Sequence, residues 1–190
     1  MTSHISAKTL DFLRSRRSHP PRMLTGPAPA RDEIMDLLTM AARVPDHGKL
    51  EPWRFIVLER ATLDRLAPLL AAHVAAEGAD EKAVEKARSA FDSPLIVAVV
   101  SAPVDHPRIP RWEQVLSAGA ACLSLLNAAL AAGYGAAWLT GPAAQPDFAG
   151  AHLGIGADEQ VVGLVHIGQR GNPPPERPRP DVAAKTSFLA

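Results

Sequence analysis

The sequence lacks the features by which several classes of protein are usually recognised. It has a single cysteine, Cys122, so the chain has no internal disulfide and nothing indicates an oxidising compartment. Its net charge is zero, because 20 Lys and Arg residues balance 20 Asp and Glu residues. We therefore predict that it binds neither nucleic acid nor an anionic membrane surface. Residues 1–11 lack the basic-then-apolar pattern of a secretory signal, so we expect a cytoplasmic protein.

Motifs for metal, nucleotide or nucleophilic chemistry are also missing. The 7 histidines show no metal-ligand spacing, and there is neither a P-loop nor a Gly-x-Ser-x-Gly elbow, so we predict no metal site. Gly133-x-Gly135 follows a helix pattern and precedes a strand pattern, the reverse of a dinucleotide fingerprint. Cys122 lies in the middle of a helix among small apolar residues, which indicates an inert packing thiol.

The composition that remains is typical of one globular domain. A chain of 190 residues with 47% hydrophobic and 21% charged residues can bury a single core, so we expect one domain over residues 1–190. Helices and buried strands alternate, which favours an α+β or α/β sandwich with helices on both faces of a sheet. The patterns predict helices from Leu10 to near Ser18, over 30–44, twice within 61–90 around Gly78, over 112–132 and over 145–153, and strands at 53–58, 94–100, 135–139 and 160–167.

The helix at 112–132 is unusually apolar, and no charged residue occurs between Glu113 and Asp147. Length and composition alone would allow a membrane-spanning helix. The segment is mostly alanine and glycine, however, and contains Ser117, Ser124 and Asn127. A helix buried all round, in a core or in a dimer interface, explains the same composition, and we predict no membrane span.

The tail is dense in proline from Gly171 to Pro180, which excludes a helix or a central strand there. Residues 171–190 are therefore either a disordered tail or an extended arm lying across a partner subunit.

Three polar segments stand out as candidate sites. Arg16-Arg17-Ser18 offers two guanidinium groups and a hydroxyl to a phosphate, although basic residues also favour the C-terminus of a helix. The loop 43–53 holds Arg43, His47 and other charged residues between a helix and a strand, and the alternative there is a solvated turn. The strand 135–139 ends in an aromatic residue and a Gly-Pro turn, which suits close approach to a planar ligand, although its tryptophan also suits a core.

Together these segments resemble the nitroreductase superfamily, in particular small single-domain bacterial proteins classed as NAD(P)H nitroreductases. The Arg-Arg-Ser segment, the Pro-Asp-His loop leading to Pro-Trp-x-Phe, the Pro-Arg-Trp-Glu-Gln of 110–114 and the strand before Thr140 occur in the family's order. The resemblance implies an α+β three-layer sandwich with a mainly antiparallel sheet, helices on both faces and an intertwined homodimer. It implies two FMN sites at the dimer interface, held by Arg16, Arg17, Ser18, Trp138, Leu139 and Thr140 of one subunit and by Arg43 and His47 of the other.

The function that the resemblance implies is ping-pong hydride transfer from NAD(P)H through flavin N5, near the backbone of Thr140, to a small acceptor such as a nitroaromatic or a quinone. The cofactor carries this chemistry, so we name no catalytic side chain. The alternatives are a non-catalytic FMN-binding or storage protein, and a dehalogenase or flavin-consuming relative on the same fold.

Several positions depart from the family's pattern or have no fixed counterpart in it. Lys49, Glu51 and Thr140 stand where better-known members have asparagine, glutamine and glutamate. For the phosphate ligand near the C-terminus, the candidates are Arg170 and Lys185. The candidates for a cation beside the flavin are Arg17 and Lys49, and the candidate for an aromatic wall is Trp112.

Overall fold

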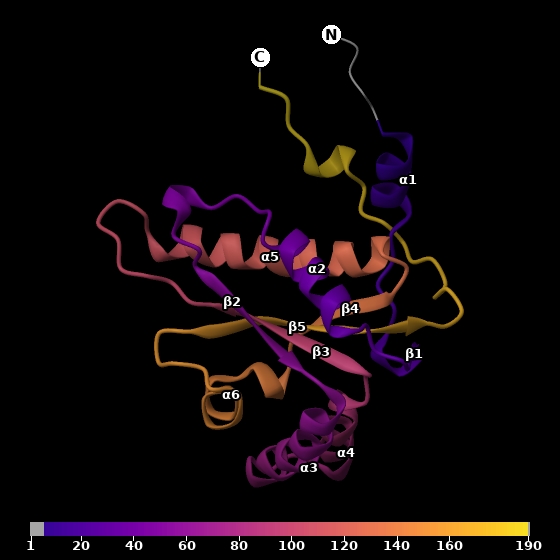
Figure 1. Ribbon diagram of the computed structural model, residues 1–190, viewed down its shortest axis with the longest axis vertical. Coiled ribbons are helices and arrows are strands. Elements are labelled where there is room, and N and C mark those ends of the chain that lie inside the picture. The colour runs from indigo at the N-terminus through magenta and orange to yellow at the C-terminus, as the bar shows by residue number, and fades with distance from the viewer. Residues whose placement is uncertain (1–5, 190) are drawn as a thin grey trace.

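The computed structural model describes residues 6–189 and shows an antiparallel sheet with helices on both faces (Figure 1). In chain order the helices and strands are α1 (Ala7–Ser15), β1 (Leu24–Thr25), α2 (Arg31–Ala41), β2 (Trp53–Leu58), α3 (Arg60–Ala76), α4 (Glu81–Arg88), β3 (Leu95–Ser101), α5 (Arg111–Ala131), β4 (Gly135–Leu139), α6 (Pro146–Leu153) and β5 (Gln160–Arg170). Short 3-10 turns lie at Pro21–Met23, His47–Lys49 (η2), Ser89–Phe91, Pro142–Ala144 and Ala183–Lys185 (η5).

The sheet is organised around β5. Residues 164–167 of β5 pair with β3 and also with β4, so these two strands lie on opposite sides of β5. β2 pairs with β3 at the outer edge, and β1 pairs with the last two residues of β5. Every pairing is antiparallel, as the resemblance predicted.

The molecule has three layers. Figure 1 shows α2 and α5 on one side of the sheet and α3, α4 and α6 on the other. Strand β3 is buried along its whole length, and its side chains alternate between two apolar clusters. Val97 and Val99 face the cluster with α2 and α5, whereas Ile96 and Ala98 face the cluster with α3, α4 and α6. This arrangement confirms the predicted α+β sandwich.

Most predicted elements occur at the predicted residues, with local differences. The first helix ends at Ser15 rather than near Ser18, because the backbone leaves the helical region at Arg16 (φ −54°, ψ 137°) and the His19 amide instead donates to the carbonyl of Ala136 at 2.8 Å. The strand predicted at 53–58 is only partly buried, because it pairs with a single neighbour at the sheet edge. The last strand continues to Arg170, because β1 pairs with its end.

The break between α3 and α4 comes where it was predicted. Gly78 adopts φ +82°, a left-handed conformation that glycine reaches without steric cost. The Asp80 side chain then accepts a hydrogen bond from the amide of Ala83 at 2.8 Å and caps the new helix.

Helix α5 is the one described helix long and apolar enough, by length and composition, to cross a membrane. It packs along the sheet, and its buried residues include Ala118, Ala121 and Leu125. Of the two predicted ways of burying this helix, the core of one chain does not suffice, because Trp112, Leu116 and Leu123 are exposed on its outer side, and burial in a dimer interface stays a prediction. The sheet covers only one side of this helix.

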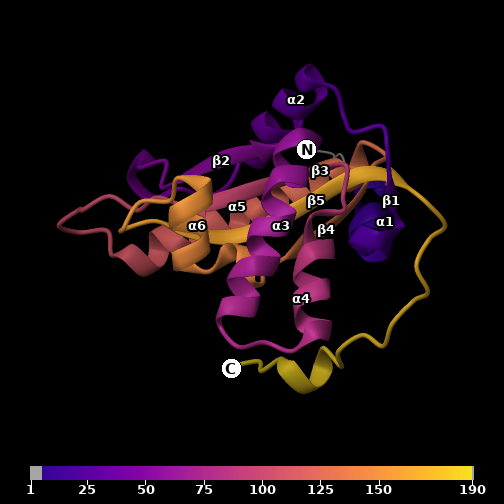
Figure 2. The same cartoon turned by 90° about the horizontal axis from the view of Figure 1, so that it is seen from below.

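Beyond β5 the chain is extended and exposed from Gly171 to Pro180, as its prolines predicted. Figures 1 and 2 show this segment turning away from the sheet, passing near α1 and ending in η5. The guanidinium of Arg17 holds it there by donating from Nη2 to the carbonyl of Pro175 at 2.8 Å.

Candidate functional site

Arg16, Arg17 and Ser18 lie together just after α1, and the described chain holds them beside the C-terminal end of α5. The backbone of His19 anchors the segment to Ala136 of β4, as described above. All three side chains are partly buried, and Nη2 of Arg16 lies 3.4 Å from the hydroxyl of Ser18. The structure leaves all three side chains partly buried after α1, and their role in holding a ligand stays a prediction.

The tail adds two further guanidinium groups to this segment. Burial, followed by the charges of Arg179, Arg17 and Arg177, lowers the pKa of Arg16. Four like charges at close range disfavour one another unless an anion joins them. Glu176 pairs with Arg179 at 2.7 Å, so the cluster is only partly compensated.

Sequence analysis missed Arg177 and Arg179. It favoured Arg170 and Lys185 as the phosphate ligand near the C-terminus. Arg170 instead turns toward the end of α5, where its Nε donates to the carbonyl of Gly133 at 2.7 Å. Lys185 lies in η5. The only available signal was the arginine-proline repeat at 177–180, which was interpreted as tail composition alone.

The arginine cluster has donors without acceptors. The Nε atoms of Arg16 and Arg17 are buried and make no hydrogen bond within the described chain. Buried polar groups are normally paired, so these two donors indicate a ligand with acceptor atoms. A phosphate fits, because its oxygens match guanidinium donors in charge and geometry.

A cavity of about 660 Å³ reaches the segment that carries this cluster, although its lining includes none of the arginines at 16, 17, 177 and 179. Pro20, which lines it, follows Ser18 by two residues. Leu139 and Thr140 line the same cavity, so the structure brings two of the three residues predicted at this strand end to it. Its volume is within the range of about 300–1,000 Å³ that is usual for sites of small molecules and cofactors. The cavity is lined by Pro20, Pro21, Arg22, Val74, Ala83, Lys86, Ala87, Ser89, Ala90, Leu139, Thr140, Gly141, Pro142, Ala143, Leu164 and His166.

Apart from Thr140, the polar side chains of this cavity were not predicted. Lys86 and Ser89 come from the end of α4, Arg22 from the turn before β1, and His166 from β5. Burial lowers the pKa of His166 to about 4, so its imidazole is uncharged at neutral pH. Nothing in the helix pattern of 81–90 distinguishes Lys86 from a solvated lysine, and only the fold brings it to the cavity.

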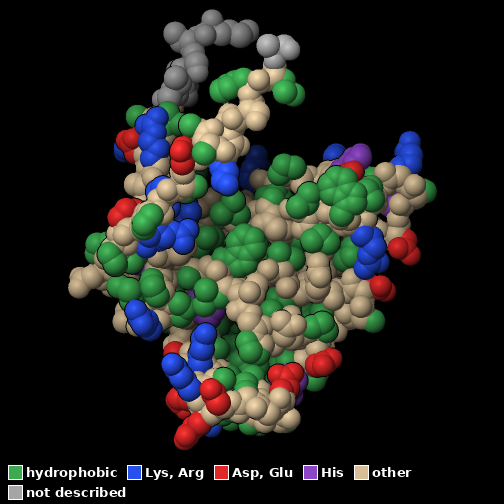
Figure 3. Space-filling view, turned by 180° about the vertical axis from the view of Figure 1, so that it is seen from behind, with side chains coloured by type: hydrophobic (Ala, Val, Ile, Leu, Met, Phe, Trp, Pro, Cys, Tyr) green, Lys and Arg blue, Asp and Glu red, His purple; other side chains and the backbone are tan. Residues whose placement is uncertain are grey.

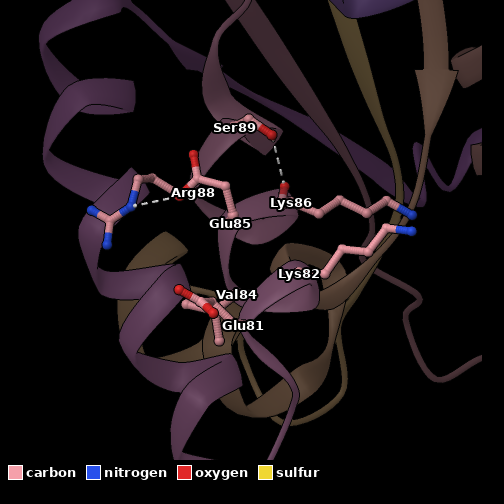
Figure 4. Close-up of a pocket in the computed structure, with 7 residues that line it drawn as sticks. All are labelled: Glu81, Lys82, Val84, Glu85, Lys86, Arg88 and Ser89. Carbon is pink, nitrogen blue, oxygen red and sulfur yellow. Dashed lines mark hydrogen bonds and ion pairs between the residues drawn. The ribbon is translucent and has the colours of Figure 1, made fainter.

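A second, open hollow involves α4 alone. Figure 4 shows Lys82 and Lys86 extending to one side of the helix, with Arg88 on the other side, where it pairs with Glu85 at 3.5 Å. The side chains here are mostly exposed and charged, which is typical of a solvated helix surface. Among the polar residues of this hollow, only Lys86 and Ser89 also line the cavity of about 660 Å³.

Trp138 lies on the other face of the sheet from Leu139. Its ring packs against the α2 and α5 cluster, and its Nε1 donates to the carbonyl of Val162 at 3.3 Å. Successive side chains of a strand alternate between faces, so residues 138 and 139 cannot both line one cavity on one face. The ring of Trp138 therefore packs as a core aromatic residue, which was the alternative that the sequence left open.

His47 lies far from Arg16 within one chain, whereas Arg43 lies between Met40 and Pro45, whose carbonyls accept from Ser124 and Ser117 along the middle of α5. His47 Nδ1 lies 2.7 Å from the Glu113 carboxylate at the start of α5, whereas Arg16 is held near the end of that helix. Helix α5 has 21 residues, so its ends are about 30 Å apart at 1.5 Å per residue. No single FMN molecule reaches across that distance.

The loop around His47 has an ordered but strained backbone. Lys49 and Glu51 adopt positive φ values of 54° and 48°, which side-chain-bearing residues rarely adopt. The carboxylate of Asp46 accepts from the amides of Leu50 and Glu51 at 3.1 and 2.8 Å and holds this conformation. The side chains of Lys49 and Glu51 are both exposed, and neither lines the cavity within the chain.

An apolar surface lies between these two regions, along the outer side of α5. Trp112, Leu116 and Leu123 are 62%, 63% and 44% exposed, and Met35 and Met40 of α2 are also exposed. Figure 3 shows that hydrophobic and uncharged groups dominate the upper part of this face, with most charges toward its margins. Apolar patches of this kind mark surfaces that bind another molecule.

Comparisons with known proteins give a consistent result. The sequence profile of the Nitroreductase family matches residues 13–169. The chain is 35% identical over 160 residues to the Escherichia coli K12 protein named "Putative NAD(P)H nitroreductase YdjA", covering 84% of this chain and 86% of that protein.

Solved structures share the whole fold. The nitroreductase-like family protein from Bacillus cereus is similar with a TM-score of 0.76 and 24% identity, covering 100% of this chain and 98% of that one. A nitroreductase with bound FMN from Bacteroides fragilis is similar with a TM-score of 0.73 and 18% identity, covering 97% of this chain and 100% of that one.

Proposed function

Because the chain belongs to the nitroreductase family, we propose that it is an FMN-dependent NAD(P)H oxidoreductase that works as a homodimer. The observation that carries this proposal is the arginine cluster beside the cavity of about 660 Å³. A ligand with a phosphate at one end and a flat ring at the other suits both parts. The related protein from Bacteroides fragilis has FMN bound.

The phosphate end of the site would be held by Arg16, Arg17 and Ser18 together with Arg177 and Arg179 of the tail. The buried, unpaired Nε donors of Arg16 and Arg17 support this assignment. The lowering of the Arg16 pKa supports it too, because a phosphate would relieve the repulsion among the guanidinium groups.

The ring end would lie in the cavity against Leu139 and Thr140. Bound FMN would accept a hydride from NAD(P)H and pass it to an oxidised acceptor, such as a nitroaromatic or a quinone, in two successive half-reactions. The chain's own contribution is to bind, orient and enclose. Lys86 and Arg22 line the cavity as cations and would stabilise an electron-rich edge of the ligand, the role that sequence analysis gave to Arg17 or Lys49.

The homodimer rests on the apolar surface of α5 and on the separation of the site residues. A second copy packed on Trp112, Leu116 and Leu123 would cover that surface. If the two α5 helices ran in opposite directions, Arg43 and His47 of one subunit would lie near the arginine cluster of the other. That arrangement would complete each site from both chains.

The test is the visible spectrum and turnover of the purified protein. We expect the flavin absorbance bands, release of FMN on denaturation, and steady NAD(P)H oxidation once a nitroaromatic or a quinone is added. A colourless protein that takes up no FMN would refute the proposal. Tight FMN binding without NAD(P)H oxidation would instead indicate a storage protein.

A further inference from the structure

We propose that His166 is a cofactor-binding residue, whose Nε2 donates a hydrogen bond to a carbonyl oxygen of the flavin ring, and that Ser93 is the positioning residue that holds its imidazole. This inference rests on the proposed function, because it takes the cavity as the site of the flavin ring. It assigns a role to the one imidazole that lines this cavity within the described chain.

The His166 ring is fixed and nearly enclosed. Its side chain is 2% exposed, and its Nδ1 lies 2.8 Å from the hydroxyl of Ser93, which is itself completely buried. Ser93 is in turn held through its carbonyl, which accepts from Nη1 of Arg60 at 2.6 Å. With Nδ1 taken by Ser93, Nε2 is the remaining hydrogen-bonding atom of a ring that lines the cavity.

The imidazole meets a ligand as a neutral group. Burial lowers its pKa to about 4, so the ring is uncharged at neutral pH. One proton is then shared between two ring nitrogens. When the Ser93 hydroxyl donates to Nδ1, the proton lies on Nε2, and the ring presents a donor to the cavity.

A donor on Nε2 agrees with the other polar groups of the cavity. The ammonium of Lys86 and the guanidinium of Arg22 are donors only, whereas the hydroxyl of Ser89 donates to the carbonyl of Lys86 at 3.1 Å. A ligand edge that faces such a wall must carry acceptor atoms. The carbonyl oxygens of a flavin ring are acceptors of this kind, and they become stronger acceptors when the ring is reduced.

Two amide substitutions separate this role from a structural one. In His166→Gln the side-chain amide nitrogen can take the place of Nε2, whereas in His166→Asn it takes the place of Nδ1. We expect His166→Gln to keep FMN affinity within about 2-fold, and His166→Asn and His166→Phe to weaken it by about 3- to 10-fold, the cost of one lost hydrogen bond.

The same variants should change the flavin itself. The loss of a donor to the ring should shift the visible absorbance bands of bound FMN and make its midpoint potential more negative in His166→Asn and His166→Phe, but not in His166→Gln. Ser93→Ala should move the same readouts in the same direction by a smaller amount, because it frees the ring without removing it. Val97→Ala is the matched control, since Val97 is completely buried on the opposite face of the sheet. It should lower the melting temperature without changing the spectrum or the potential.

The outcomes are distinct. Equal FMN affinity and equal spectra in the wild type and all three His166 variants would overturn the role of His166 while leaving the proposed function intact. Equal losses in His166→Gln and His166→Asn, with the spectrum of bound FMN unchanged, would reduce His166 to a structural residue. A wild-type protein that binds no FMN would overturn the proposed function, and this inference with it.

Discussion

Replacing Arg16 by alanine should weaken FMN binding by roughly 10- to 100-fold and leave riboflavin binding nearly unchanged. Its buried Nε has no partner in the chain, so a phosphate would supply one. Hydrogen bonds to charged groups contribute about 1.5–3 kcal/mol, and each 1.4 kcal/mol corresponds to a tenfold change in Kd. Riboflavin has no phosphate, so its affinity should not change when Arg16 is removed.

The same substitution should have the opposite effect on the protein without cofactor. Burial and the charges of Arg179, Arg17 and Arg177 lower the pKa of Arg16, which means that its charged form is less stable in the folded chain than in water. Removing that charge should therefore leave the melting temperature of the cofactor-free protein unchanged or raise it. In the presence of saturating FMN, the melting temperature should fall below that of the wild type.

Titration calorimetry with FMN and with riboflavin, at low and high salt, would measure the effect. Arg14→Ala is the matched control, because Arg14 lies two residues earlier, in α1, with its side chain 73% exposed, and forms an ion pair with the exposed Asp11 at 3.6 Å. It should change neither affinity. If Arg16→Ala weakens FMN and riboflavin equally, or Arg14→Ala weakens FMN as much, the phosphate does not bind at Arg16.

Three further predictions concern packing, pH and assembly. Gly163→Ala would place a Cβ against the indole of Trp138 and should destabilise the fold by about 1–3 kcal/mol in urea denaturation; a stability equal to the wild type would contradict this packing. The guanidinium of Arg54 lowers the pKa of Glu159 from 4.5 to about 2, so the stabilisation should be complete above pH 4.5 and be lost as the pH falls toward 2. After a discount for solvent screening, Glu159→Gln should cost about 1 kcal/mol at pH 7 and less at pH 3, and a constant difference in urea titrations at both pH values would refute this. Leu116→Glu should convert a dimer into a monomer in light scattering and reduce FMN uptake; an unchanged mass would reject α5 as the interface.

Much of the fold could be predicted because its signals are local. The run at 94–100 is apolar and β-branched, and it forms the buried strand β3. The break near Gly78 and the long helix before Gly133 also follow from residues next to them in the chain. The two-residue strand β1 could not be predicted, because only its pairing with the end of β5 defines it.

The candidate site was predicted where a motif lies within a few residues, and it was missed where distant segments meet. Arg16 to Ser18 and Leu139 with Thr140 were identified as segments, and they lie at or beside the cavity. Lys86 and His166 were not identified, since an isolated lysine on a helix and an isolated histidine on a strand have no distinctive pattern. Arg177 was missed for a different reason: the arginine-proline repeat is a local signal, but only the path of the extended tail brings it to Arg16.

That tail also sets the order of events during synthesis. Nη2 of Arg17 bonds to a carbonyl 158 residues later in the chain, and the guanidinium groups that accompany Arg16 come later still. A nascent chain on the ribosome can form most of the sheet, but it cannot assemble the full basic cluster until residue 179 has emerged. FMN uptake with full affinity should therefore be post-translational. A protease that cuts the exposed segment after Gly171 should weaken FMN binding while leaving the sheet intact.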